Sequence, residues 1–300
     1  MNIWQTQTWW ELLKKTGQVE QMFHIDDICV EKRKVSFWEF GLFVIWLERE
    51  PKKTEFARLI ELCKKEHCLF VQIETLSYSG ETPTIPNFWE KYYKKFIPPY
   101  TAVLELKASE EEILKNMKPK WRYNIGVSQK KGVQCAIVEK SKENIESFFH
   151  LMKETTSRDN FSGNTYAYYE TFLKELKESE LILAYYQDTL IAWGIFVFDD
   201  VSLYYYGASS SKERNVMAPY LVQWTAIQEA KKRGASLYDF LGVAGPWEKN
   251  SPLLGVTDFK LKFTTDTRLV SKSFIYIHKK RKYFFIRLLK RLSSLAKIKK

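Results

Sequence analysis

The sequence predicts an α+β fold built from two domains of similar architecture that meet at Gly132. The chain has 300 residues, which suits one large domain or two of ordinary size. Hydrophobic residues make up 45% of it and aromatic residues 16%, so a disordered chain is excluded and much β-structure is indicated. Helical spacing and short strands alternate on each side of Gly132. We therefore expect domains at residues 1–132 and 133–277, with a tail at 278–300.

Before Gly132, the predicted strands are rich in β-branched and aromatic residues. They are residues 35–47 (two strands around Gly41), 69–73 and 100–106. Apolar residues at helical spacing predict a helix at 54–65. The Pro-bearing segment 82–99 is expected to be a loop with one helix at 87–95, and two more helices are expected after Ser109 and at 121–131. Ser109 and Glu112 form a capping-box pattern, which marks a helix start, and Pro119 separates that helix from the next.

After Gly132, the same alternation returns and ends in a predicted antiparallel meander and a further helix. The expected strands are 133–138, 181–186, 190–198, 202–208, 237–241 and 267–277. The expected helices are 141–155, 166–178 and one that begins at Pro219, a residue favoured in the first helical turn, and ends near Gly234. No residue-level repeat accompanies this duplication, so it is predicted from architecture alone.

The positive charge of the protein is concentrated in its tail. The net charge is +11, but residues 278–300 hold ten Lys or Arg and no Asp or Glu, which leaves 37 basic and 36 acidic residues elsewhere. A helix there would carry an apolar stripe of Phe285, Leu288, Leu289, Leu292 and Leu295. Basic residues would lie beside this stripe, among them Arg287, Lys290 and Arg291. Three roles for the tail stay open: contact with an anionic membrane, contact with tRNA, or packing on the first domain.

The sequence does not indicate a metal site or a secreted protein. The four cysteines show no C-x-x-C pair, so we expect reduced, packed thiols and no bound metal. The amino terminus lacks the charged and apolar regions of a signal peptide. No apolar run reaches the roughly 18 residues that span a bilayer. We expect a cytoplasmic monomer, with the tail leaving open a peripheral position at the inner face of the cell membrane.

Three stretches together resemble the Fem family of aminoacyl-tRNA-dependent peptidyltransferases. They are KPKWRYNI at 118–125, YYYGASS at 204–210, and YDFLG at 238–242 followed by GVTDFKLKF at 255–263. Shorter similarities extend the resemblance over nearly the whole chain. It implies two tandem domains of the GNAT acyltransferase type, here without the coiled-coil arm of some members. It also implies transfer of an amino acid from aminoacyl-tRNA to an amine of a peptidoglycan precursor, which is either lipid-linked or a soluble nucleotide.

Within this resemblance, Lys260 matches the functional lysine of the family and is the first catalytic candidate. Phe259 beside it is assigned to substrate binding, whereas Lys262 is expected to face solvent. Aminolysis of an ester needs a positioned amine and a stabilised oxyanion, and no protein nucleophile is required. Without the motif, Lys260 would be interpreted as an ordinary solvated lysine.

Four further residues are assigned by the same resemblance. Arg158 and Lys14 match cations that the family directs toward its anionic precursor, although a loop-capping arginine and a surface lysine are equal alternatives. Tyr206 matches an aromatic residue of the peptide channel, with core packing as the alternative. Glu74 ends an apolar strand, where a carboxylate could take the proton of the attacking amine or simply close the strand.

No cofactor is expected. Coenzyme-A-dependent enzymes of this fold hold the pyrophosphate with R/Q-x-x-G-x-G/A at a helix start. Here the corresponding run is RNVMAP at 214–219, in which Met217 and Pro219 replace the two small residues and Pro219 removes an N–H donor. The predicted partners are therefore aminoacyl-tRNA and a peptidoglycan precursor. The alternative is a GNAT-type acyltransferase that uses another acyl donor or a cell-envelope polysaccharide acceptor.

Overall fold

A computed structural model describes residues 2–36, 38–80, 86, 89–159 and 163–298, without the side chains of 158–159 and 293–298. The chain divides into two compact units. The terminal unit consists of Asn2–Ile97 with Val270–Lys300, and the central unit of Pro98–Leu269. The predicted boundary at Gly132 is therefore wrong, because the segment from Pro98 to Gly132 belongs to the central unit and the carboxy-terminal segment to the terminal unit.

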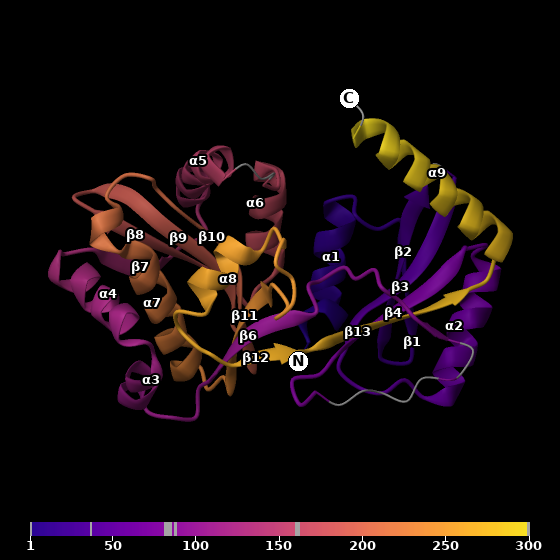
Figure 1. The fold of residues 1–300 in the computed structure, drawn as a ribbon, viewed down its shortest axis with the longest axis horizontal. Coiled ribbons are helices and arrows are strands. Elements are labelled where there is room, and N and C mark those ends of the chain that lie inside the picture. The colour runs from indigo at the N-terminus through magenta and orange to yellow at the C-terminus, as the bar shows by residue number, and fades with distance from the viewer. Residues whose placement is uncertain (1, 37, 81–85, 87–88, 160–162, 299–300) are drawn as a thin grey trace. The chain divides into compact units, whose positions relative to one another are not determined.

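The terminal unit is a six-stranded mixed sheet of order β1-β2-β3-β4-β13-β5 (Figure 1). Only β3 and β4 pair in parallel, and the other neighbours are antiparallel. The strands are β1 (Gln21–Ile25), β2 (Ile28–Ser36), β3 (Glu39–Leu47), β4 (Phe70–Leu76), β5 (Glu90–Lys91) and β13 (Ser271–Ile277). The helices are η1 (Ile3–Gln5), α1 (Gln7–Lys15), α2 (Lys53–Lys65) and α9 (Lys280–Ile298).

Helix α2 covers one face of this sheet because its apolar side chains recur at helical spacing. Its Phe56, Leu59 and Cys63 pack against Val44 of β3 and Val71 of β4 in one buried cluster. Successive residues of a strand point to opposite faces, so Phe43 of β3 and Phe70 of β4 lie on the other face, where the Phe70 ring packs against Tyr283 of α9. The predicted helix at 54–65 is confirmed.

Two predictions for the terminal unit are wrong. Gly41 lies inside β3, and the connection between β2 and β3 comes earlier in the chain. A Cβ at position 41 would lie 2.8 Å from the ring of Phe70, which favours glycine there. The predicted helix at 87–95 includes residues 87–88, which are outside the described part. Where the segment is described, Glu90 and Lys91 form strand β5, which pairs with β13.

The central unit is a seven-stranded mixed sheet of order β12-β6-β11-β10-β9-β8-β7. Its strands are β6 (Tyr100–Glu105), β7 (Gln134–Val138), β8 (Ser179–Tyr186), β9 (Thr189–Val197), β10 (Val201–Ser209), β11 (Leu237–Val243) and β12 (Thr267–Leu269). Its helices are α3 (Glu110–Asn116), α4 (Pro119–Lys130), α5 (Lys142–Asp159), α6 (Tyr166–Glu175), η2 (Arg214–Val216), α7 (Ala218–Lys232) and α8 (Leu254–Lys260).

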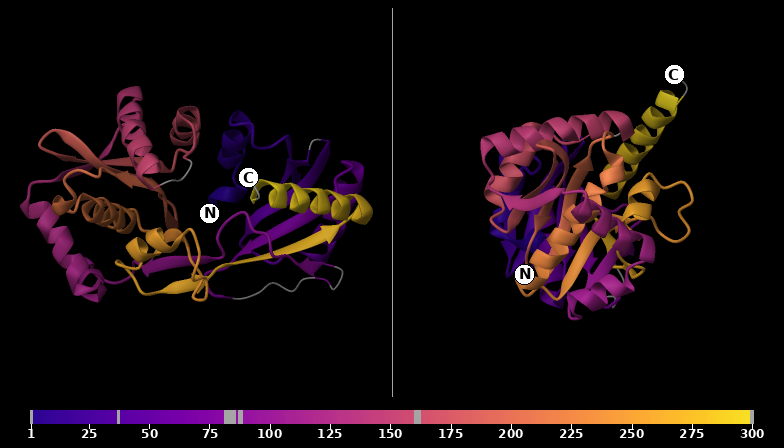
Figure 2. Two further views of the ribbon diagram at one scale, coloured as in Figure 1. Left: turned by 45° about the horizontal axis from the view of Figure 1, so that its top comes forward. Right: turned by 90° about the vertical axis from the view of Figure 1, so that its left-hand side faces the viewer.

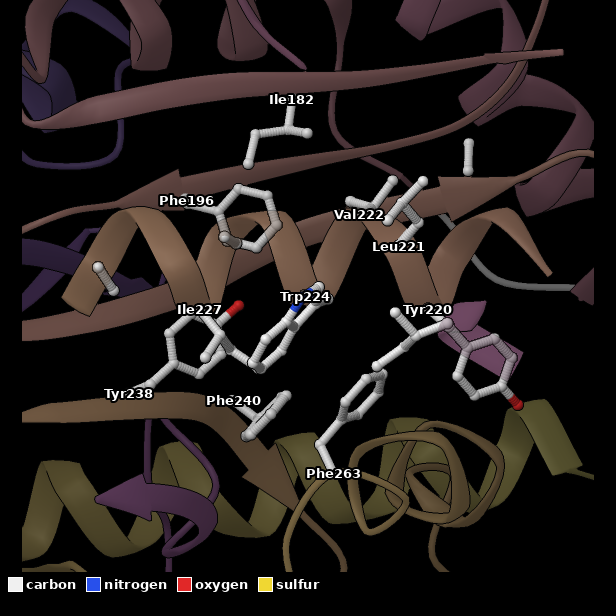
Figure 3. Close-up of a cluster of buried hydrophobic side chains, with 14 of the residues drawn as sticks. Ile182, Phe196, Tyr220, Leu221, Val222, Trp224, Ile227, Tyr238, Phe240 and Phe263 are labelled. Carbon is white, nitrogen blue, oxygen red and sulfur yellow. The ribbon is translucent and has the colours of Figure 1, made fainter. Parts of the chain in front are cut away.

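Helices cover both faces of the central sheet (Figures 1 and 2). On one face, Phe148 of α5 and Tyr169 of α6 contact Trp193 of β9. On the other face, Val222 and Trp224 of α7 join Phe196 of β9 in a second buried cluster, whose labelled side chains interlock in Figure 3. The two faces of β9 therefore carry separate halves of the core.

Residues 267–277 do not form one strand. They divide into β12, which pairs with β6 of the central unit, and β13, which pairs with β4 of the terminal unit. Each sheet thus combines antiparallel strands with one parallel pair and receives strands from both halves of the sequence. The predicted α+β class with two mixed sheets is confirmed. The longest described helix is α9 with 19 residues, and no described segment forms a coiled-coil arm.

Candidate active site

The central sheet opens between its two parallel strands, β10 and β11. They pair at only three positions, Val201–Leu203 against Leu237–Asp239, although β10 continues to Ser209 and β11 to Val243. An irregularity in β10 lies between Tyr204 and Tyr206, and another in β11 lies between Asp239 and Gly242. Beyond the pair Leu203–Asp239, the two strands no longer pair with each other. Their facing backbone edges are therefore open to a substrate there.

Lys260 lies at this opening, at the last residue of α8. Its side chain is only 7% exposed, and its ammonium donates hydrogen bonds to the carbonyl oxygens of Leu241 (3.1 Å) and Gly242 (2.8 Å). Its Nζ lies 5.9 Å from the centre of the Tyr204 ring. Burial lowers the pKa of Lys260 to about 8, against a smaller raising effect of the nearby Asp239 charge. A lysine held in this way combines a buried charge with a tuned pKa, which is typical of functional sites.

The irregularity in β11 places the two carbonyl groups that Lys260 binds. Leu241 has a φ of +57°, a left-handed conformation that is unusual for a residue with a side chain. The Asp239 carboxylate holds this turn by accepting hydrogen bonds from the Leu241 N–H (2.6 Å) and from the Thr101 hydroxyl. Gly242 is required because a Cβ there would lie 2.5 Å from Pro98. Asp239 therefore orients the backbone of this turn.

Helix α8 is tied to the same strand, which sets the position of Lys260. The Thr257 hydroxyl accepts a hydrogen bond from the Ala244 N–H at 2.8 Å. Tyr204 packs beneath the ammonium, and burial raises the pKa of its hydroxyl. Gly207 leaves room for the Tyr204 hydroxyl group, since a side chain at that position would collide with it.

The motif residues around Lys260 have structural partners of their own. Phe259 packs edge-on against Phe263 (5.4 Å between ring centres) and Tyr220 (5.9 Å) at the margin of the core. Lys262 does not face solvent as predicted. Its ammonium lies 4.4 Å from the centre of the Trp121 ring and donates to the Tyr220 hydroxyl at 3.1 Å. The aromatic residues around it attract the cation through their ring faces, which explains the difference.

Tyr206 is not brought to Lys260. Its hydroxyl lies 3.0 Å from that of Tyr168, and its ring packs against Tyr169 and Phe172 of α6. It therefore belongs to the sheet face covered by α5 and α6, whereas Tyr204 joins the cluster on the α7 face. The family resemblance assigns Tyr206 to the peptide channel and does not single out Tyr204. The irregularity between the two residues places their rings on opposite faces of the sheet, which strict alternation along a strand would not predict.

Glu74 belongs to the terminal unit and lies on the β4 face opposite α2. It is fully buried and accepts hydrogen bonds from the Gln72 side chain (2.9 Å) and the Phe96 N–H (2.6 Å). Its second carboxylate oxygen has no hydrogen-bond partner among the described residues. Burial raises the pKa of Glu74 to about 7, partly offset by these hydrogen bonds.

The two proposed precursor-binding cations are less constrained. Lys14 is exposed near the end of α1, with its ammonium 5.7 Å from the centre of the Trp10 ring. The backbone of Arg158 lies in the last turn of α5, and its side chain is outside the described residues.

Helix α9 uses one face to pack on the terminal unit. Tyr283 is buried, and its hydroxyl donates to that of Tyr92 at 2.9 Å. Arg287 donates to the Tyr93 hydroxyl at 3.0 Å, and Lys290 to the Val35 carbonyl oxygen at 2.6 Å. Arg291 is exposed. Beneath this face lies a cavity of about 300 Å³, in which the basic residues are Lys34, Lys94, Lys95, Arg287 and Lys290.

Among the described residues, we find neither a reactive cysteine nor a group of side chains placed to bind a metal ion. All four cysteines have free thiols, and burial raises the pKa of each one to about 11 or 12. No described group of His, Cys, Asp and Glu is arranged to hold a metal ion. Across the described chain, every helix is too short or too polar to cross a membrane.

Sequence comparison places most of the chain in one family. The sequence model of the FemAB family matches residues 86–189 and 177–291. Lipid II:glycine glycyltransferase of Staphylococcus haemolyticus is 24% identical over 283 positions, which cover 71% of this chain and 67% of that protein. The Staphylococcus aureus enzyme of the same name is 34% identical over 98 residues, or 33% of this chain and 23% of that protein. The chain thus spans only part of the length of these relatives.

Structural comparison agrees on the fold. The crystal structure of FemX superposes with a TM-score of 0.81 and 17% identity, covering 95% of this chain and 94% of that one. L-PGS from Bacillus licheniformis gives a TM-score of 0.57 and 12% identity over 94% of this chain and 90% of that one. The fold of FemX is therefore the fold of this chain.

Proposed function

This chain belongs to the FemAB family, and on that premise we propose that it transfers an aminoacyl group from tRNA to an amine of a peptidoglycan precursor. The observation that carries the proposal is Lys260, a buried ammonium bound to two carbonyl groups where β10 and β11 separate. The acceptor is proposed from the relatives named lipid II:glycine glycyltransferase.

The reaction is aminolysis of an ester. The acceptor amine attacks the carbonyl carbon of the aminoacyl ester, a C–N bond forms, and the carbonyl oxygen becomes negatively charged. The C–O bond to the tRNA ribose then breaks, the leaving oxygen gains a proton, and the attacking nitrogen loses one. The main need of this reaction is a fixed positive group near the developing oxyanion.

Lys260 can meet that need. An ammonium has three N–H donors, and two of them are used by Leu241 and Gly242. No acceptor for the third donor occurs among the residues that the structure describes. We assign this donor to the oxyanion, in surroundings that water barely reaches because the side chain is buried. With a pKa of about 8, the group is mostly charged at pH 7.

The start of α7 supports a donor other than coenzyme A. Met217 precedes the helix in a left-handed conformation, with φ of +58°. Pro219 contributes no N–H, and the Tyr220 N–H donates to the Met217 carbonyl oxygen at 3.0 Å. Fewer helix-start donors are therefore left for a pyrophosphate. Aminoacyl-tRNA brings its own large binding surface and suits this arrangement better.

Glu74 is proposed separately as a proton acceptor. A carboxylate whose pKa is about 7 can take up a proton near neutral pH, and its unpaired oxygen offers a site for it. Glu74→Gln keeps the shape and the acceptor oxygen for the Phe96 N–H but cannot take a proton. Lys14 and Arg158 are proposed to bind the anionic part of the precursor.

The test is transfer from charged tRNA, using a full set of aminoacylated tRNAs with lipid II or the soluble nucleotide precursor. We expect a product with one added amino acid for at least one tRNA. Lys260→Met should reduce turnover about 10²- to 10³-fold while precursor binding persists. Lys262→Met is the matched control, because it removes a neighbouring cation whose contacts are with aromatic rings.

Two outcomes would contradict the proposal. Absence of transfer from every charged tRNA to both precursors would reject the reaction, and acylation from an acyl-coenzyme A instead would support the alternative acyltransferase. Normal turnover by Lys260→Met would reject the assignment of Lys260 while leaving the reaction in place.

A further inference from the structure

Helix α9 presents a continuous apolar surface to solvent. Five large side chains on it are about half exposed, at 49–61%: Phe284, Phe285, Leu288, Leu289 and Leu292. At roughly 100° of rotation for each helical residue, these five positions cover an arc of roughly 140°. Isolated exposed apolar residues are ordinary, but five on one helical arc indicate an interaction surface.

The opposite side of α9 is the side that packs on the terminal unit. Tyr283 and Ile286 turn inward there and line the basic cavity together with Arg287 and Lys290. The apolar arc is therefore not the face that attaches α9 to the protein, and it stays exposed when that attachment is complete. The tail thus packs on the terminal unit, as one of its predicted alternatives had it, but through Tyr283 and Ile286 and not through the described residues of the stripe. The side chain of Leu295 is outside the described part.

Basic groups border the apolar arc. A second hollow on this side is lined by Tyr93, Phe284 and Leu288 together with Lys94, Arg287, Lys290 and Arg291. None of the residues lining the two hollows is acidic. Apolar and cationic side chains thus meet in one place, as the hydrocarbon and phosphate groups of a phospholipid layer do.

We propose that α9 docks the protein on an anionic phospholipid bilayer. Its apolar arc enters the boundary between headgroups and acyl chains, and Lys94, Arg287 and Arg291 receive lipid phosphates. Long basic side chains can keep their charge at the headgroups while their stems lie along apolar surface. This inference goes beyond the proposed transfer reaction, because it concerns a different surface and needs neither tRNA nor precursor.

The charge and the apolar arc together favour a bilayer over other occupants. A second copy docked helix to helix would bring together two tails that each hold ten Lys or Arg and no Asp or Glu. An RNA would satisfy the cations but leave the five apolar side chains in water. An anionic bilayer satisfies both.

The test is binding of the full chain to vesicles, measured by co-sedimentation. One vesicle set contains only phosphatidylcholine, and the other contains equal parts of phosphatidylcholine and phosphatidylglycerol. We expect clear binding to the second set and little to the first, with weakening at high salt. The vesicles contain no precursor, so the result is independent of the transfer reaction.

Two double variants separate the apolar and the charged contributions. Phe285→Ser with Leu289→Ser should lower vesicle affinity about tenfold, since both side chains are exposed and the packed face is untouched. Lys94→Gln with Arg291→Gln should lower it about fivefold for each charge and reduce the salt dependence. Unchanged circular dichroism and thermal midpoint would show that the variants fold.

Matched controls use the central unit. Tyr123, which is 70% exposed, is changed to Ser as the apolar control. Lys142→Gln with Lys232→Gln removes two well-exposed charges as the electrostatic control. Neither control should alter vesicle binding by as much as the α9 variants.

Several outcomes would overturn the proposal. Equal binding to both vesicle sets, or unchanged binding by the Phe285/Leu289 variant, would reject it. The protein could bind bulk tRNA and not vesicles. If that tRNA binding depended on Lys94 and Arg291 but not on Phe285 and Leu289, the surface would be identified as an RNA-binding surface. Self-association that the apolar variant abolishes would identify a second copy as the occupant.

Discussion

Replacing Lys260 should change how the stability of the protein depends on pH. Lys260→Met keeps a long side chain but removes the buried charge. In the folded protein, burial lowers the pKa of Lys260 from 10.5 to about 8, so the folded state binds its proton less tightly than the unfolded state does. Between pH 8 and pH 10.5 the unfolded state holds more protons, and the free energy of unfolding therefore rises with pH.

The size of this effect follows from the pKa difference. The interval from about 8 to 10.5, at 1.36 kcal/mol for each pH unit, corresponds to about 3 kcal/mol. The side chain is almost fully buried, so solvent screening does not reduce it much. Lys260→Met also leaves the Leu241 and Gly242 carbonyl groups without their donor, which costs about 1–3 kcal/mol at every pH.

Urea denaturation of the wild type and of Lys260→Met between pH 7 and pH 10.5 measures the difference in unfolding free energy. We expect this difference to shift in favour of the wild type by about 3 kcal/mol across that range. Titrations common to both proteins cancel in the difference. Lys232→Met, at a well-exposed position, controls for the loss of one positive charge. A pH-independent difference would refute the account of Lys260 as a buried, charged group.

Three further predictions concern the same sites. If the ammonium is the active form of Lys260, kcat/KM for transfer should fall as pH rises through about 8, and a rise there would indicate a neutral amine acting as base. Gly242→Ala should lower the free energy of unfolding by about 1–3 kcal/mol and reduce transfer, because the new Cβ would lie 2.5 Å from Pro98. Gly126→Ala is the control, because that position within α4 is open and the change should not destabilise the protein. Burial raises the pKa of Glu74 from 4.5 to about 7, so its contribution to the unfolding free energy should fall by about 3 kcal/mol as the pH rises through that range. In urea denaturation, the difference between Glu74→Gln and the wild type should shift in favour of the variant by that amount, and a pH-independent difference would contradict the assignment.

Local chemistry made several elements predictable. Ser109 and Glu112 exchange the hydrogen bonds of a capping box, and α3 begins there as expected. Pro119 opens α4 at a position where a missing N–H costs nothing, and Gly132 follows the helix in a left-handed conformation with φ of +80°. These elements depend on residues close in sequence, so the pattern alone was sufficient.

Long-range pairing was not predictable in the same way. Gly132 is a local helix end, and nothing nearby reveals that β6 pairs with β11 more than a hundred residues later. The segment 267–277 has the composition of one strand, yet its two parts pair with strands of different units. Strand composition reports burial and backbone preference but does not name the partner strand.

The candidate site divides along the same line. The sequence by itself determined the family resemblance, the choice of Lys260, and an amphipathic basic helix at the tail, because these depend on residue types at short spacing. Only the tertiary structure decided which carbonyl groups hold the ammonium, that Tyr204 and not Tyr206 lies beside it, and which face of α9 stays exposed. The physical reason is that strand irregularities, buried charges and packed faces arise from contacts between distant segments, which no local pattern specifies.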